Sequence, residues 1–328
     1  MAELRFEFLD VGEGDGTIIE FPNEEVMLVD FGSLKNRKLT TTDAIAYIVK
    51  YFPQLKKEQH LEYLVITHGD QDHYNFIQKL FEALNLKTIG NFLYAGKKVD
   101  FDNFGKKYLP KLIDMALEVP RLPAQFHSDP KKPYWTEGDV QIWILSANYP
   151  SVDAVQTNPK SIVMRFRYKS LNMILCGDAT DDTEASILSH YGAASQFLST
   201  DLLKAGHHGS DTSSSVEWIK ATKPEIVYIS ADMHLGYGLP KCYIVKRIID
   251  NTKLFKLKEK HGFVCWNHVK NYWDDNEVET ALLCSLITAN QGVQWEFRVD
   301  SKGDWHIGRT AGLVAALEIP SGDIGKLP

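Results

Sequence analysis

Short apolar segments alternate with polar turns over the first third of the chain. This pattern predicts strands at 4–9, 16–21 and 26–30, with a Gly-rich turn between the first two. An amphipathic helix is expected at 41–52, because its apolar positions recur on one face. A further apolar strand at 61–66 runs into a polar loop, and a second amphipathic helix follows that loop. The opening of the chain therefore indicates a mixed α/β protein.

Strands and helices alternate again after residue 140. The strands expected there are 140–147, 161–168, 171–175, 201–205, 225–230, 263–266, 282–288 and 293–299. The helices expected there are 181–190, 213–222 and 241–251. Together these elements suggest an α/β fold of two sheets covered by helices, a four-layer αββα sandwich.

One domain is expected to span residues 1–260, and a C-terminal extension to span 261–328. The segment of about 95–136 is rich in Lys, Tyr and Pro, carries one expected helix at 102–117, and reads as an insertion. The extension is expected to be β-rich at first and irregular in its tail.

The composition narrows the classes of function. The chain has 328 residues, 44% of them hydrophobic and 24% charged, as is typical of a globular protein. Its 36 Lys and Arg against 43 Asp and Glu give a net charge of −7, which argues against a global basic field for nucleic acid or membranes. Because we find no apolar run of about 18 residues and no signal-peptide pattern, we expect no membrane association and a cytoplasmic location.

The four cysteines are Cys176, Cys242, Cys265 and Cys284. They are far apart, lie mostly in apolar stretches and form no CxxC pair. This spacing argues against a disulfide framework and against a thiolate zinc site, and it favours a reducing compartment.

Two imidazoles and two carboxylates lie within six residues, directly after the apolar strand 61–66. The loop reads His68-Gly69-Asp70-Gln71-Asp72-His73. A tight loop after a buried strand can aim these side chains at one point, where imidazole suits Zn²⁺ and carboxylate also accepts Mn²⁺. The alternative is a polar loop with two incidental histidines.

Two other strand ends carry similar residues. Asp178 follows Gly177 at the end of strand 171–175, and His207 and His208 lie in a Gly-flanked loop after strand 201–205. Alone, a Gly-Asp pair is usually a turn, and the histidine pair could be solvated before a capped helix. Three strand-end clusters rich in His and Asp nevertheless imply one shared site.

These motifs, in this order, resemble the metallo-β-lactamase-fold hydrolases. They resemble more closely the branch that includes the C-terminal hydrolase domain of ComEC-type DNA-uptake proteins, in which HxHxDH becomes HxDxDH, as here with Asp70. The matching segments are 8–15, 28–32, 67–73, 176–178 and 206–213. The resemblance spans about residues 4–250 and implies the αββα sandwich.

The resemblance implies a cofactor of two divalent metal ions, Zn²⁺ or Mn²⁺. The metal ligands that it implies are His68, Asp70, Asp72, His73, Asp178 and His207. The first two would bind one ion, the next two the other, and Asp178 would bridge them.

Other residues are expected to assist the centre. At least one of His207 and His208 should be a ligand, with His207 preferred and His208 left to contact a substrate oxygen. Asp30 is expected to support the ligand loop, and Asp10 and Asp15 either do likewise or simply form a turn.

One departure from the family pattern concerns its Tyr-Gly-His-Pro element. Leu239 stands where the histidine is expected, so a late ligand or proton donor is either missing or replaced by His234. The alternative for His234 is a surface loop histidine. His127 falls where many members place another ligand, but the sequence around it does not match.

A dinuclear centre is suited to hydrolysis, because paired cations activate water and offset charge on the attacked group. Asp72 or Asp178 could orient the hydroxide or take its proton. We therefore expect a phosphodiesterase or a nuclease, with DNA or RNA as the substrate of a nuclease. The alternatives are a small-molecule hydrolase (phosphoesterase, lactonase or β-lactamase-like) and a turnover-deficient subunit that binds a protein partner through the C-terminal extension.

A nuclease should line its groove with cations and with aromatic rings that stack on bases. The candidate cations are Lys97, Lys98, Lys106, Lys107, Lys111, Lys131, Lys132, Arg165 and Arg167. The candidate rings are Tyr94, Phe101, Phe104, Tyr108, Tyr134 and Trp135. The alternative is a solvated helix face with core aromatics, and a neutral or acidic rim would favour the small-molecule hydrolase.

Overall fold

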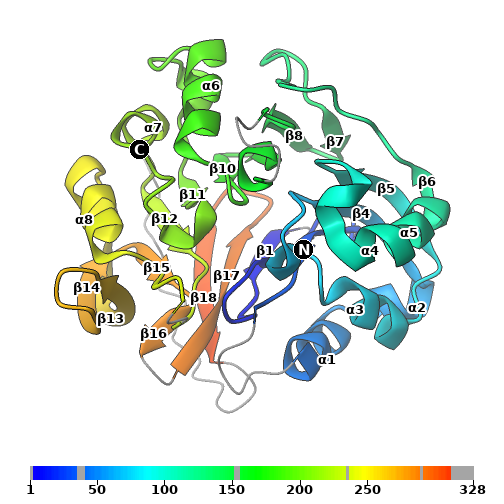
Figure 1. The fold of residues 1–328 in the computed structure, drawn as a ribbon, viewed down its shortest axis with the longest axis horizontal. Helices are drawn as coiled ribbons and strands as arrows, with labels where there is room; N and C mark the ends of the chain where they lie inside the picture. Colours follow the sequence, from blue (N-terminus) through cyan, green and yellow to red (C-terminus); the bar gives the residue numbers. More distant parts are fainter. Residues whose placement is uncertain (1–2, 35–40, 151–155, 234–235, 289–290, 312–328) are drawn as a thin grey trace.

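Two β-sheets lie between two groups of helices (Figure 1). The computed structural model describes residues 3–34, 41–150, 156–233, 236–288 and 291–311. The first sheet contains, in spatial order, β16 (Leu286–Thr288), β17 (Gln291–Val299), β1 (Leu4–Phe8), β2 (Gly16–Glu20), β3 (Val26–Phe31), β4 (His60–Ile66), β5 (Thr88–Tyr94) and β6 (Ala116–Glu118), and β18 (Trp305–Ala311) pairs with β17.

The second sheet has antiparallel strands at one edge and parallel strands at the other. Its strands, in spatial order, are β15 (Leu282–Cys284), β12 (Ile226–Ile229), β11 (Leu202–Lys204), β10 (Leu171–Leu175), β9 (Val163–Tyr168), β8 (Val140–Ser146) and β7 (Trp135–Glu137). A separate two-stranded hairpin consists of β13 (Lys256–Asn267) and β14 (Tyr272–Thr280).

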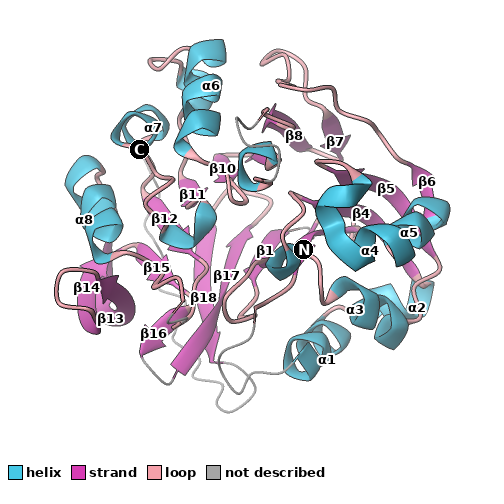
Figure 2. Cartoon of the chain, in the orientation of Figure 1, coloured by secondary structure: helices cyan, strands magenta, loops and turns pink. Residues whose placement is uncertain are grey.

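The helices form the two outer layers, as the colouring by secondary structure shows (Figure 2). Beside the first sheet lie α1 (Thr41–Tyr51), α2 (Pro53–Glu58), α3 (Ile77–Leu84), α4 (Asp102–Lys107) and α5 (Leu109–Met115). Beside the second sheet lie α6 (Asp181–Tyr191), α7 (Val216–Thr222) and α8 (Cys242–Asn251). The predicted αββα sandwich is confirmed.

The central core fills the space between the sheets. Phe6 and Phe8 of the first sheet face Phe166 and Tyr228 of the second, and all four side chains are buried. The Phe6 and Phe166 rings meet edge to face, and the Phe8 and Tyr228 rings stack. Burial of this apolar area from both sheets fixes their mutual position.

The helix predicted at 102–117 is two helices. The chain turns at Tyr108, between α4 and α5, and Pro110 lies in the first turn of α5. Proline lacks the N–H that a continuous helix needs at that position, so it favours a new helix start. Residues 116–118 continue as β6, parallel to β5.

The strands after residue 260 pair within both sheets. Strand β17 lies antiparallel to β1, and β15 lies parallel to β12. The division of the chain at residue 260 stays a prediction, and the structure shows that these later strands share the sheets of the earlier ones. The expected irregular tail after residue 311 lies outside the described residues.

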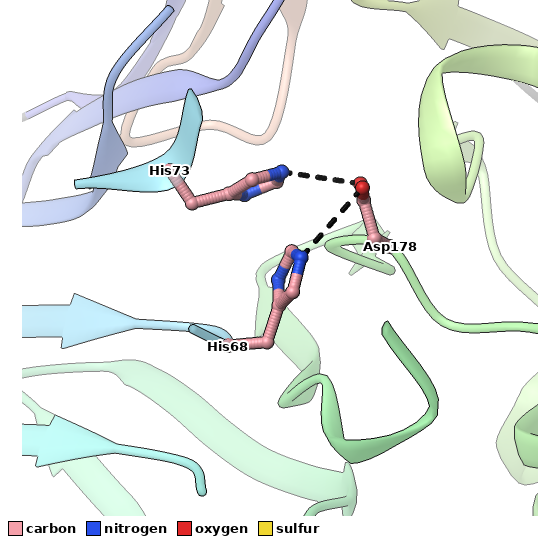
Figure 3. Close-up of side chains that lie close together, drawn as sticks. All are labelled: His68, His73 and Asp178. Atoms are coloured by element: carbon pink, nitrogen blue, oxygen red, sulfur yellow. Dashed lines mark ion pairs between the residues drawn. The ribbon is translucent and has the colours of Figure 1, made fainter. Parts of the chain in front are cut away.

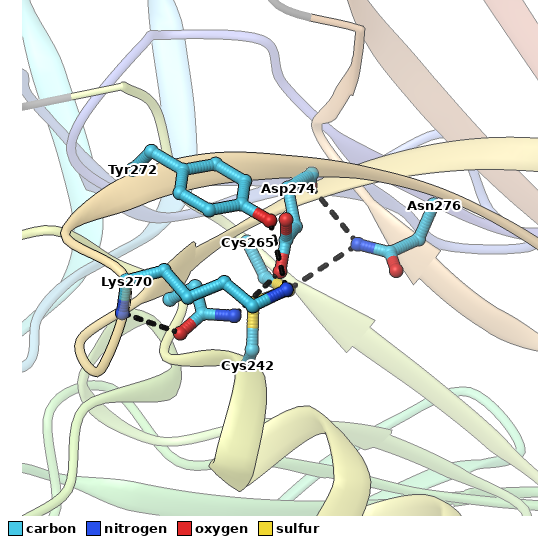
Figure 4. Close-up of a disulfide and its surroundings, with 7 residues drawn as sticks. Cys242, Cys265, Lys270, Tyr272, Asp274 and Asn276 are labelled. Atoms are coloured by element: carbon cyan, nitrogen blue, oxygen red, sulfur yellow. Dashed lines mark hydrogen bonds between the residues drawn. A yellow bond between two sulfur atoms is a disulfide. The ribbon is translucent and has the colours of Figure 1, made fainter.

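The expectation of no disulfide is wrong for one pair of cysteines. Cys242 at the start of α8 is bonded to Cys265 in β13, with 5.0 Å between their Cα atoms (Figure 4). Cys176 and Cys284 are buried and form no disulfide in the described part of the chain. The sequence did not predict this disulfide because the two cysteines are 23 residues apart and match no local motif. The sulfurs come together because the β13–β14 hairpin packs against α8.

Candidate metal centre

The predicted ligand loops meet at strand ends from both sheets. The first sheet supplies the loops after β1, β3 and β4, and the second supplies the loops after β10 and β11. Parallel strands present their carboxyl ends at one edge of a sheet, where loops can converge on a site. The loop after β4 forms a short 3-10 turn, Gln71–His73, which places both Asp72 and His73 in buried positions.

Asp178 lies at the middle of this centre. Its Oδ2 is 3.7 Å from His68 Nε2, and its Oδ1 is 3.3 Å from His73 Nε2 (Figure 3). The two imidazole rings are 4.1 Å apart between centroids, and all three side chains are buried. His68, His73 and Asp178 therefore form a group that can hold a metal ion.

His208 belongs to a second group. Its Nε2 lies 3.4 Å from Asp72 Oδ2 and 3.4 Å from Asp178 Oδ2. Asp72, His73 and His208 thus lie close enough to share another ion, and His73 is common to the two groups. The structure brings these predicted residues together, whereas their binding of metal stays a prediction.

The two adjacent histidines differ in their surroundings. Asn158 Nδ2 donates a hydrogen bond of 3.0 Å to His207 Nε2, and His207 Nδ1 lies 2.6 Å from the Thr212 hydroxyl. Both His207 nitrogens are therefore engaged, and its Nε2 is 3.9 Å from Asp178. This geometry favours His208 as the ligand. His207 has the more exposed ring of the two and lines the cavity.

Three histidines share a ring orientation that suits a metal. The Nδ1 atom of His68 faces the Thr67 hydroxyl at 3.1 Å, that of His73 faces Asp30 at 2.8 Å, and that of His208 faces the Ser230 carbonyl at 2.8 Å. When Nδ1–H donates in this way, the Nε2 lone pair is left for a metal. The three Nε2 atoms are buried and make no hydrogen bond of good geometry in the described part of the chain.

Asp70 is the most exposed of the predicted ligands. Its Oδ2 lies 3.5 Å from His68 Nε2, and the Thr157 hydroxyl donates to its other oxygen. Burial raises its pKa, but the nearby His68 and the hydrogen bond from Thr157 prevail and lower the pKa of Asp70 to about 2. The carboxylate is therefore ionised at neutral pH, as metal binding requires.

Asp30 holds the ligand loop, as predicted. The Thr67 backbone N–H donates to Oδ1 at 2.7 Å, and the Thr67 hydroxyl donates to Oδ2 at 2.7 Å. The same Oδ2 accepts from His73 Nδ1. One buried carboxylate on β3 thus fixes both the start of the loop and the orientation of one imidazole.

Lys204 was not predicted to belong to the centre. It ends β11 with a buried side chain, and its Nζ lies 2.5 Å from Asp15 Oδ2. Asp15 in turn lies 3.8 Å from His73 Nδ1 and 3.9 Å from His208 Nδ1. The signal in the sequence was a lysine at the end of an otherwise apolar strand, because a buried cation usually has an ionic partner.

Charge couples the imidazoles to the carboxylates. Burial lowers the pKa values of His73 and His208, but the nearby Asp178 prevails and raises both well above the ordinary value. Without metal, these rings are therefore protonated partners of the carboxylates. Binding of a metal must displace those protons, so affinity should fall as the pH is lowered.

A cavity of about 410 Å³ opens onto the centre. Apart from the predicted ligands, its lining in the described residues is Glu13, Leu34, Asn158, His208, Ser210, Asp211, Gly236, Tyr237, Leu239 and Lys241. Leu239, 4% exposed, gives an apolar wall where the family pattern has an imidazole. His234 lies outside the described residues, and Asp10 is buried.

The predicted cationic track does not line this cavity in the described residues. Arg165 stacks on Trp143 and Phe197 on the helix side of the second sheet. The lysines of α4 and α5 belong to the helices beside the first sheet. His127 lies with Ser186 and His190, away from the groups that can hold a metal.

Sequence comparison finds two curated relatives. The chain is 24% identical over 269 residues to ComE operon protein 3 of Bacillus subtilis, covering 80% of this chain and 31% of that protein. It is 25% identical over 190 residues to the competence protein ComA of Neisseria gonorrhoeae, covering 58% of this chain and 23% of that protein. The chain therefore spans a third or less of the length of these relatives. The resemblance to ComEC-type proteins is confirmed at this level.

No family model matches the chain. Among solved structures, the metallo-β-lactamase fold protein YhfI from Bacillus subtilis is similar, with a TM-score of 0.45 and 15% sequence identity. The match covers 76% of this chain and 94% of that one.

Proposed function

We propose that the chain is a metal-dependent hydrolase that uses two divalent ions to cleave a phosphodiester. The convergence of His68, His73 and His208 carries this proposal. Each ring engages its Nδ1 with a neighbouring oxygen and turns a buried Nε2 toward Asp178 or Asp72. Buried polar atoms rarely lack good hydrogen bonds, so these atoms are best explained as ligands of a bound cation.

The spacing of the donor atoms fits such a cation. With zinc–ligand bonds of about 2.1 Å, two ligand atoms of a tetrahedral site lie about 3.4 Å apart. The imidazole nitrogens of the centre lie 3.3–3.7 Å from the Asp178 oxygens. His68 and Asp70 would hold one ion. Asp72, His73 and His208 would hold the other, and Asp178 lies close to both sets. This set of nitrogen and oxygen donors suits Zn²⁺ and also accepts Mn²⁺.

The protein groups have separate tasks in hydrolysis. A bound divalent ion lowers the pKa of water and offsets charge on the attacked phosphate. Burial raises the pKa of Asp178, but the surrounding histidines prevail and hold it well below the ordinary value. Asp178 therefore stays an acceptor that can orient the attacking water. His207 lines the cavity, and its side chain is 22% exposed.

A phosphodiester fits this centre because two cations stabilise the charge that develops on its phosphate. The resemblance to ComEC-type DNA-uptake proteins supports nucleic acid as the molecule whose phosphodiester is cleaved. The cavity favours a second candidate, a small-molecule phosphoesterase, because its described lining contains several carboxylates and Lys241 as its single Lys or Arg. The turnover-deficient subunit and the protein partner of the extension stay predictions.

The cytoplasmic location also stays a prediction. No helix among the described residues is long and apolar enough to cross a membrane. The Cys242–Cys265 disulfide is evidence against the expected reducing compartment, because disulfides persist mainly in oxidising ones.

The test is hydrolysis by protein stripped of metal and reloaded with Zn²⁺ or Mn²⁺. The substrates are bis-p-nitrophenyl phosphate, single- and double-stranded DNA, RNA and cyclic nucleotides. We expect metal-dependent cleavage that falls at least about 100-fold in Asp72→Ala and is unchanged in Asp139→Ala, which alters an exposed carboxylate. Absence of all phosphodiester cleavage, or full activity of Asp72→Ala, would refute the proposal.

A further inference from the structure

One wall of the cavity comes from the loop 236–241. Tyr237 contributes a side chain that is 53% exposed, and Lys241 contributes a half-buried one. The Lys241 ammonium donates a hydrogen bond of 2.7 Å to the Tyr237 carbonyl. Lys241 and Tyr237 are therefore neighbours in the lining of the same cavity that contains the candidate metal ligands.

The fold holds this loop in place. The Trp266 N–H donates to the Pro240 carbonyl at 2.8 Å, and the Lys241 N–H donates to the Gly209 carbonyl at 3.1 Å. A Cβ atom on Gly238 would lie 2.6 Å from the Trp266 ring, so the ring packs directly on the backbone there. The disulfide joins the residues next to these contacts. The loop is thus anchored to the β13–β14 hairpin and to the histidine loop.

The charges of the cavity limit what it can bind. Its carboxylates include the candidate metal ligands, whose charge bound ions would offset. Asp211 adds a further negative group and accepts a hydrogen bond from the Ser210 hydroxyl, whereas burial raises the pKa of Glu13 to about 8. A duplex held along several phosphates needs several cations, whereas a single flanking phosphate needs one. Lys241 is the single Lys or Arg among the described lining residues.

We propose that Lys241 and Tyr237 bind the nucleotide next to the scissile phosphate, so that the substrate is a short phosphodiester or the end of a single strand. This inference rests on the proposed function. The Lys241 ammonium pairs with the flanking phosphate, and the Tyr237 ring stacks on the base, as aromatic side chains do in single-strand binding.

The first test compares the dinucleotide TpT with the same dinucleotide carrying a terminal phosphate. In Lys241→Met we expect the ratio of kcat/KM for the phosphorylated over the plain dinucleotide to fall about tenfold, mainly through KM. Lys241→Arg should restore most of the ratio. Lys246→Met is the matched control, because this lysine is exposed on α8 and paired with Asp250, and it should leave the ratio unchanged.

The second test concerns the base and the number of phosphates. Tyr237→Phe should retain the KM for TpT, whereas Tyr237→Ala should raise it about tenfold. For a single-stranded oligonucleotide, log KM should rise with log salt with a slope of about 0.7, the value for one neutralised phosphate, and the slope should disappear in Lys241→Met. A linear single strand should be cut faster than a circular one of the same length.

The outcomes separate the two proposals. If the wild type cleaves bis-p-nitrophenyl phosphate but shows no preference for the terminal phosphate, or the same preference in Lys241→Met, the inference is wrong and the proposed function stands. If circular and linear single strands are cleaved equally fast, the enzyme cuts inside the strand, and the proposal that it acts on a strand end is wrong. If no phosphodiester is cleaved at all, both proposals fail.

Discussion

Asp30→Asn tests how the ligand loop is held, because it keeps the shape of the side chain and removes its charge. Both carboxylate oxygens accept hydrogen bonds: Oδ1 from the Thr67 backbone, and Oδ2 from the Thr67 hydroxyl and His73. Asparagine offers one carbonyl oxygen and one NH₂ group. In either orientation, at least one of these buried donors therefore loses its acceptor.

The less damaging orientation keeps the oxygen toward His73 and turns the NH₂ group toward the Thr67 N–H. A buried donor left unsatisfied in this way costs about 1–3 kcal/mol, so the free energy of unfolding should fall by that amount. The imidazole also loses the carboxylate that supports its basicity and orientation. Loss of such a partner typically costs about 10- to 100-fold in metal affinity, and we expect that rise in the Kd for Zn²⁺.

Two measurements check this prediction: urea unfolding of the metal-free protein and competition for Zn²⁺ with a chromophoric chelator. Asp139→Asn is the matched control, because Asp139 is exposed and pairs with the exposed Lys169. The reasoning is refuted if folded Asp30→Asn binds Zn²⁺ within twofold of the wild type, or if the control weakens binding equally.

Three further predictions concern the disulfide, a buried carboxylate and a close approach of the backbone. Cys242→Ser opens the link to Cys265, with its separation of 23 residues, and should lower the free energy of unfolding by about 3 kcal/mol; equal urea midpoints with and without reductant would contradict this. Burial raises the pKa of Glu184 to about 7 in the folded protein, above the value of 4.5 in the unfolded chain. The protonated carboxyl therefore adds fully to the stability of the fold below about pH 4.5, and this contribution is lost as the pH rises through about 7. Glu184→Gln should therefore flatten the fall in Tm between about pH 5 and 8. If Tm falls with pH in this variant as in the wild type, Glu184 is not the cause of the fall. Gly32→Ala places a Cβ atom 2.6 Å from the Asp72 carbonyl carbon, so the loop must shift and metal affinity measured by titration should drop; an unchanged affinity would contradict this.

The sequence located the candidate site because ligand-type residues follow apolar strands directly. The strands β4 and β10 end two residues before His68 and three residues before Asp178, and the pattern of apolar residues is enough to place those strand ends. The order of residues along the sequence also predicted the loop with His207 and His208. It could not decide between these two histidines, because the choice depends on Asn158, which comes from a different part of the chain.

Partners that are distant in sequence were not predictable from local patterns. Lys204 and Asp15 pair only because β11 and the loop after β1 belong to sheets that pack face to face. The disulfide depends likewise on the β13–β14 hairpin lying against α8.

By itself, the sequence determined the local elements and the residues available at their ends, because periodicity and turn chemistry act over a few residues. Only the tertiary structure decided which of these residues touch. Packing of the two sheets places Asp178 among histidines from both sheets, and strand β17 lies beside β1 although almost 300 residues separate them in sequence. Such contacts follow from burial of the whole core, which no short segment of sequence specifies.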